Sequence, residues 1–130
     1  MFKILVATDG SEHARKVVND VIKIAAPIKA EVIVLTVEDW TAADRDAGAK
    51  AKDAVEKAVT AFKENDITVS PLIRKGTKRA ADVIIEVADE ENVDLIVLGS
   101  RGLRGVKEVF LGSVSHRVVH MTDKNVMVIK

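Results

Sequence analysis

Apolar positions follow two patterns that alternate along the chain. Five short runs are almost continuously apolar, which is typical of strands buried on both faces of a parallel sheet. These runs cover residues 2–8, 31–39, 67–74, 93–99 and 125–130. Between the runs, apolar residues recur every three or four positions, which predicts amphipathic helices. The predicted helices begin at Ser11, at about Thr41, at Gly76 with Thr77, and at Ser113.

The regular alternation of strands and helices predicts an α/β fold with a parallel sheet. Ser11 is a candidate N-cap of the first helix, and Pro27 is expected to end that helix. The second helix is expected to continue to Asn65 and the last to about Met121. Pro71 lies within the third run, and because proline cannot donate to a strand ladder, this strand is predicted at an edge of the sheet.

Composition narrows the class of protein. A length of 130 residues predicts one domain, 1–130, and 20 basic against 20 acidic residues leave no charge that favours nucleic acid or an anionic membrane. The chain has no cysteine, which excludes disulfides and cysteine-ligated metal. The first apolar run is too short for a signal peptide or a membrane span. We therefore expect a cytoplasmic protein.

One segment, "LGSRGLRGVKEVFLGSVS" at positions 98–115, holds four of the seven glycines. In open parallel sheets, ligands bind beyond the carboxyl ends of the strands, where the strand order reverses. If the first and fourth strands are neighbours there, Asp9 and Gly99 would line the same crevice. Glycines and the helix beginning at Gly112-Ser113 could hold a phosphate through backbone N–H groups. The alternative is a loose, solvated connection.

Two common phosphate-binding motifs are absent. A P-loop requires Lys after its second glycine, but Val106 follows Gly105 and Ser113 follows Gly112. The dinucleotide motif G-x-G-x-x-G would follow the first strand, where the chain instead reads "DGSEHA". The protein is therefore neither a Walker NTPase nor a standard Rossmann dehydrogenase.

The glycine-rich segment resembles the universal stress protein family, which carries G-x2-G-x9-G-[ST] after its fourth strand. Here Gly99, Gly102 and Gly112-Ser113 have this spacing. The start "ILVATDGSEHA" and the ending "GSVSHRVVHMTDKNVMVIK" are similar to the family's first and last segments, so the resemblance covers the whole chain. It implies a three-layer α/β/α sandwich with Rossmann-like strand order 3-2-1-4-5, and a homodimer formed through the last strand, 125–130.

The resemblance also implies binding of an adenine nucleotide, usually ATP, with AMP or ADP as alternatives. Asp9 would contact the ribose. The other carried-over positions are Ala7, Thr8 and Val37 around the adenine, Leu98 and Gly99 at the pocket floor, Arg101 and Gly102 at the phosphates, and Gly112, Ser113, Val114 and Ser115 closing round them. The residues alone leave an alternative for Asp9, which could instead cap the turn that follows it.

A metal site is less well supported. His116 and His120 are four residues apart on one predicted helix, a spacing that can place two imidazoles on one metal, but no acid in that helix offers a third ligand. We interpret the pair as solvated helix surface. A divalent cation, Mg²⁺ or Mn²⁺, could separately accompany the nucleotide, with Asp9 as a candidate ligand.

Three functions remain as hypotheses. The first is a dimeric, nucleotide-binding regulatory protein of the stress response. The second is a slow ATP hydrolase or phosphotransferase, for which no catalytic residue can be named because the segment offers only one acid, Glu108. The third is a protein-interaction module with no nucleotide. A phospho-receiver domain is disfavoured because Asp9 lacks the acidic neighbours that such a site needs.

Overall fold

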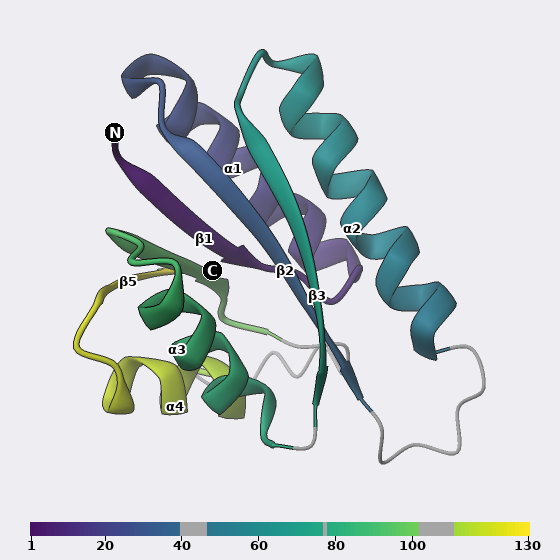
Figure 1. Cartoon of the computed structure of the whole chain (residues 1–130), viewed down its shortest axis with the longest axis vertical. Helices are drawn as coiled ribbons and strands as arrows, with labels where there is room; N and C mark the ends of the chain where they lie inside the picture. Colours follow the sequence, from purple (N-terminus) through teal and green to yellow (C-terminus); the bar gives the residue numbers. More distant parts are fainter. Residues whose placement is uncertain (40–46, 77, 102–110) are drawn as a thin grey trace.

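The computed structural model describes residues 1–39, 47–76, 78–101 and 111–130 (Figure 1). Strands and helices alternate through these residues, as predicted. In chain order they are β1 (Lys3–Ala7), α1 (Glu12–Ile28), β2 (Glu31–Asp39), α2 (Ala47–Glu64), β3 (Val69–Gly76), α3 (Ala80–Glu90), β4 (Leu95–Gly99), α4 (Ser113–Met121) and β5 (Asn125–Ile129).

The strands form one parallel sheet in the order β3-β2-β1-β4-β5. This is the doubly wound order that the family resemblance implied. Pro71 pairs with Val34 in β3, which is an edge strand, so the prediction from proline is confirmed. At the opposite edge lies β5.

Two hydrophobic cores lie on the two faces of the sheet. Ile4 and Val6 of β1 pack with residues of α1 and α2, whereas Leu5 packs with residues of α3 and α4. All three side chains are fully buried, each contributing about 1.5–3 kcal/mol as an upper estimate. The result is a three-layer sandwich, in which Figure 1 shows α3 and α4 in front of the sheet and α1 behind it.

Two predicted helix boundaries were wrong. α1 continues past Pro27 and ends at Ile28, and its C-cap Lys29 has a left-handed φ of 54°. Proline removes only its own backbone donor, and the N–H groups of Lys29 and Ala30 beyond it still bond to the Ala26 and Ala25 carbonyls (3.3 and 3.0 Å), which closes the last turn. α3 begins at Ala80 rather than at Gly76, because β3 stays paired with β2 through Gly76 opposite Asp39. Thr77 lies outside the described residues, as does the predicted helical start at 41–46.

β1 occupies the position where the strand order reverses. The chain passes from β1 to β2 on one side, and β4 pairs with β1 on the other. Loops leaving the carboxyl ends of β1 and β4 therefore diverge, and a crevice opens between them. Among the described residues, no helix is long and apolar enough to cross a membrane.

Candidate functional site

A crevice of about 180 Å³ opens at the carboxyl ends of β1 and β4. Its lining consists of Ala7, Thr8, Asp9, Leu35, Val37, Ala80, Ile84, Leu98, Gly99, Arg101, Gly112, Ser113, Val114 and Ser115. All the predicted site residues are in this set except Gly102, which lies outside the described residues. The structure thus brings together segments separated by most of the chain, and what they bind stays a prediction.

Three residues of the lining were missed from the sequence. Leu35 lies two positions before Val37 on β2 and therefore faces the same side of the sheet. Ala80 and Ile84 are four apart on α3 and share one helix face. These spacings could have added the three residues to the site, but only the packing of α3 over the sheet shows that its first turn reaches the crevice.

The chain after β1 is held by a compact set of hydrogen bonds. The Thr8 N–H donates to the Leu35 carbonyl (2.9 Å), and the Thr36 hydroxyl donates to the Thr8 carbonyl (2.8 Å). These two bonds tie the residue before Asp9 to the neighbouring strand β2. The crevice wall formed by Thr8 and Asp9 is therefore an extension of the sheet.

Asp9 caps the turn that follows β1, one of the two roles that the sequence allows for it. Its Oδ1 accepts a hydrogen bond from the Ser11 N–H (2.9 Å), forming a turn that leads into α1. Ser11 in turn caps α1, because its hydroxyl accepts from the Ala14 N–H (3.1 Å), as predicted. A carboxylate can accept several hydrogen bonds, so this turn leaves acceptor capacity on Asp9 at the crevice.

The opposite wall is the N-terminal turn of α4. The first bond within this helix runs from the His116 N–H to the Gly112 carbonyl (2.9 Å), so the N–H groups of Ser113 to Ser115 precede the helical ladder. Such groups, with the positive end of the helix dipole, favour an anion. Ser115 is buried, and its hydroxyl donates back to the Gly112 carbonyl (3.3 Å).

Gly112 leaves little room for a side chain. A Cβ at this position would lie 3.3 Å from the Ser100 carbonyl oxygen, which accepts a hydrogen bond from the Gly112 N–H (2.9 Å). This bond joins the residue that follows β4 to the residue that precedes α4. This hydrogen bond therefore holds the two ends of the glycine-rich segment next to each other.

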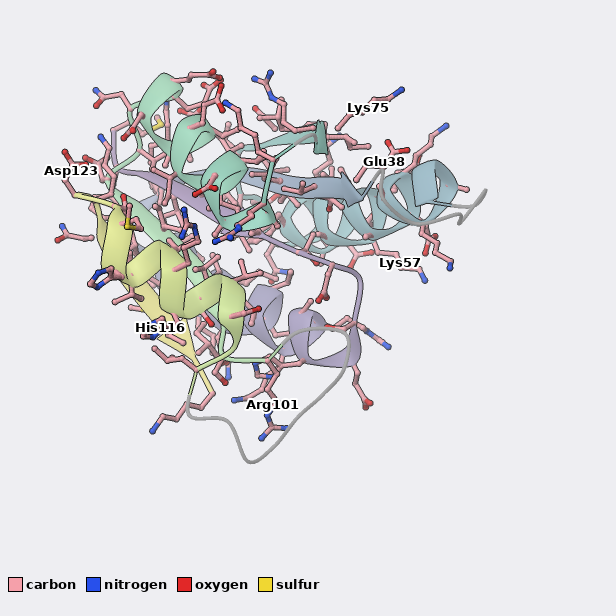
Figure 2. The ribbon with its side chains drawn as sticks, turned by 90° about the horizontal axis from the view of Figure 1, so that it is seen from below. Glu38, Lys57, Lys75, Arg101, His116 and Asp123 are labelled. Atoms are coloured by element: carbon pink, nitrogen blue, oxygen red, sulfur yellow. The ribbon has the colours of Figure 1, made fainter. Side chains whose placement is uncertain are left out.

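Charge at the crevice is mixed. Asp9 and Arg101 are the two charged residues among its described lining. Figure 2 looks onto this end of the molecule and shows Arg101 on the side of α1 and α4. An acid and a guanidinium in the same crevice suit a ligand that carries both hydroxyl groups and negative charge.

The histidine pair lies outside the crevice. His116 and His120 stack on the exposed side of α4, with parallel rings whose centroids are 6.3 Å apart. Within the described residues, no group of three or more His, Asp or Glu side chains could hold a metal ion. Asp9 is the one carboxylate among the described residues that line the crevice.

The architecture and the crevice define a class of protein: a doubly wound α/β fold with a binding crevice at its topological switch point. The model of the Universal stress protein family matches residues 1–130. The chain therefore belongs to the universal stress protein family, as the glycine spacing suggested.

Individual relatives are similar over nearly the whole chain. Universal stress protein Sll1654 of Synechocystis is 34% identical over 140 residues, covering 99% of this chain and 86% of that protein. Universal stress protein MJ0531 of Methanocaldococcus jannaschii is 28% identical over 140 residues, covering 98% and 81%.

Solved structures of relatives have the same fold. The structure of MJ0577 from Methanocaldococcus jannaschii matches with a TM-score of 0.87 at 30% identity, covering 98% of this chain and 94% of that chain. A universal stress protein crystallised in complex with cAMP matches with a TM-score of 0.78 at 26% identity, covering 98% and 95%.

Proposed function

We propose that this chain is a single-domain, adenine nucleotide-binding universal stress protein that acts as a dimeric regulator in the cytoplasm. The observation that carries the proposal is the crevice at the switch point, where an apolar wall, an aspartate and a helix N-terminus converge. The relative that was crystallised with cAMP supports an adenine nucleotide as the ligand class.

Each part of the crevice suits one part of a nucleotide. The apolar residues Val37, Ile84 and Leu98 would contact the adenine ring, and Asp9 would accept hydrogen bonds from ribose hydroxyls. Arg101 and the N-terminal turn of α4 would meet the phosphates, together with Gly102 as the family pattern implies.

The volume indicates how such a ligand would lie. Pockets that bury a whole ligand measure roughly 300–1,000 Å³, whereas this crevice measures about 180 Å³. We therefore propose that it encloses the base and sugar, while the phosphates lie at its open end beside Arg101. ATP is the favoured ligand, with ADP or AMP as alternatives, and Mg²⁺ or Mn²⁺ could accompany the phosphates and reach Asp9.

An enzyme is the weaker alternative. Asp9 is the one carboxylate in the described lining, and it already accepts a hydrogen bond from the Ser11 N–H. Phosphoryl transfer to water needs a group that orients the nucleophile as well as groups that neutralise charge. No second acid is available there for that task, so we expect ATP hydrolysis to be slow, well below ~1 s⁻¹. The third hypothesis, an interaction module with no nucleotide, predicts an empty crevice.

Calorimetric titration with ATP, ADP, AMP and cAMP tests the proposal, with GTP as the comparison base. We expect a Kd below about 1 mM for at least one adenine nucleotide, which corresponds to more than ~4 kcal/mol of binding free energy. Absence of binding by all four adenine nucleotides at this concentration would overturn the proposal and favour the interaction module.

A matched pair of glycine variants locates the site. Gly112→Val introduces a side chain whose Cβ lies 3.3 Å from the Ser100 carbonyl oxygen, and should abolish ATP binding while the far-UV circular dichroism stays that of wild type. Gly48→Val, at an exposed position of α2, should leave the affinity unchanged. Equal ATP affinity in Gly112→Val and wild type would remove α4 from the site.

A further inference from the structure

We infer that His13 is a positioning residue for the proposed nucleotide site, acting on the backbone junction that joins β4, α4 and β5. The inference rests on the proposed function and adds a residue that the family's glycine pattern does not contain. His13 lies in the first turn of α1, outside the crevice lining, and touches the junction from the other face of the sheet.

The first observation concerns Gly99, the first glycine of the pattern. A Cβ on Gly99 would lie 2.7 Å from His13 Cδ2 and 3.0 Å from His13 Nε2, with Val17 Cγ2 at 3.2 Å. Distances below 3.0 Å cannot be accommodated without movement. The space that a side chain would need is therefore filled by the imidazole. Gly99 is required here by the packing of α1 against the end of β4.

The second observation is a shared hydrogen-bond acceptor. The carbonyl oxygen of Ile129, at the end of β5, accepts from the Ser100 N–H (2.9 Å) and lies 3.1 Å from His13 Nε2. Because a carbonyl can only accept, Nε2 is the protonated nitrogen in this contact. The Ser100 carbonyl then accepts from the Gly112 N–H (2.9 Å). A continuous path of hydrogen bonds thus leads from His13 to the N-cap of α4.

These two contacts act on the same short stretch of backbone. The imidazole packs against Gly99 and donates a hydrogen bond to the Ile129 carbonyl, which also accepts from the Ser100 N–H. Packing on one side and hydrogen bonds on the other therefore fix Gly99 and Ser100 in place. The same turn of α1 follows the Asp9–Ser11 bond. His13 therefore sets the position of the α4 wall relative to the Asp9 wall, across which the nucleotide would lie.

Substitution of His13 tests this role through ATP affinity. His13→Ala should weaken ATP binding about fivefold or more, because the α4 wall loses a part-buried hydrogen bond that holds it in place for the ligand. His13→Gln, whose side-chain amide can donate to the Ile129 carbonyl, should recover most of the affinity. His120→Ala, at an exposed position of α4, is the matched control and should bind as wild type. Wild-type affinity in a folded His13→Ala protein would overturn the inference.

A second experiment needs no nucleotide. Amide hydrogen exchange should quicken at Ser100 and Gly112 in His13→Ala, whereas Thr122, whose N–H bonds to Val118 at the far end of α4, should keep its rate. Unchanged exchange at both junction amides would overturn the inference. Because the wild-type titration reports on nucleotide binding alone, failure of the proposed function is distinguishable from failure of this positioning role.

A double-mutant cycle separates the role of Gly99 from that of its neighbours. Gly99→Ala alone should lower the melting temperature, since its Cβ would overlap the imidazole. In the His13→Ala background the overlap with the imidazole is gone and only the Val17 Cγ2 contact at 3.2 Å remains, so the same substitution should cost less. Residues in contact give such non-additive effects, whereas independent sites add. Additive losses would show that the imidazole does not dictate glycine at position 99.

Discussion

Asp9 shows how a single side chain can serve local structure and a ligand at once. The sequence leaves two readings open, ribose contact and a cap of the following turn. The structure shows the turn directly, through the bond from the Ser11 N–H to Oδ1. It also places Asp9 in the crevice lining. The two roles are compatible because a carboxylate has more acceptor sites than the turn uses.

Replacement of Asp9 by Asn and by Ala distinguishes these roles. Asn keeps an oxygen for the Ser11 N–H, but its remaining NH₂ group cannot accept a bond from a ribose hydroxyl. We expect Asp9→Asn to melt near the wild-type temperature yet bind ATP at least about tenfold more weakly, since a hydrogen bond to a charged group contributes ~1.5–3 kcal/mol. Asp9→Ala should lose both stability and affinity. Calorimetric titration and thermal melts measure the two effects.

Deoxyribose analogues of ATP provide a control in which the ligand, rather than the protein, is changed. If Asp9 binds the ribose, deoxyribose analogues of ATP should bind the wild-type protein more weakly than ATP, and the difference should shrink in Asp9→Asn. Wild-type ATP affinity in Asp9→Asn would instead assign Asp9 to the turn alone.

At the scale of elements, α3 and α4 are joined beside the crevice that both help to form. Arg117 of α4 donates from Nε to Asp82 Oδ1 (2.9 Å), and its Nη2 lies 3.5 Å from Asp82 Oδ2. Both side chains are about one-third exposed. Asp82 is in the first turn of α3, where a negative charge also suits the helix dipole. The pair thus fixes the separation of two crevice walls.

We expect Asp82→Ala and Arg117→Ala to be non-additive in stability. The pair is partly exposed, so its coupling free energy should be about 0.5–1 kcal/mol and should fall as salt screens it. Urea unfolding of both single variants and the double variant, at about 0.05 M and about 1 M salt, measures this coupling. Additive losses at low salt would show that the contact does not join the helices energetically.

The elements themselves were largely predictable from the sequence, whereas the ends of some of them were not. α4 matches the residues predicted from helical periodicity, and β2 matches the apolar run predicted as a strand. The start of α3 was predicted too early because the sequence "KGT" is typical of a turn before a helix. In the structure, pairing with β2 keeps Gly76 in strand β3. A local signal cannot report how far a neighbouring strand extends, since that depends on tertiary pairing.

For the whole molecule, the location of the crevice follows from rules that need only the order of elements. Alternating strands and helices imply a parallel sheet, and a doubly wound sheet places ligands at its switch point. The contribution of α3 to the crevice and the contact of His13 with Ile129, 116 positions away, could not be predicted in this way. Both depend on how helices pack on the sheet, which periodicity does not specify.

The two edges of the sheet make the proposed homodimer testable. β5 and β3 each expose one large apolar side chain to a similar extent, Met127 at 37% and Ile73 at 39%. An edge strand also presents unpaired backbone groups that favour pairing with another chain. Val119 and Met121 of α4 are exposed as well, and they precede β5 in the chain. These features favour β5 as the surface that a second copy covers.

We expect the wild-type protein to sediment with twice the 14.1 kDa mass of the chain, and Met127→Lys to sediment as a monomer. Two copies paired along β5 would bring like charges together, which destabilises a strand pair. Ile73→Lys places the same charge on the opposite edge and should remain a dimer. Met127 is not among the described residues of the crevice lining, so we expect monomeric Met127→Lys to keep binding ATP. A dimer that survives Met127→Lys and dissociates in Ile73→Lys would move the interface to β3.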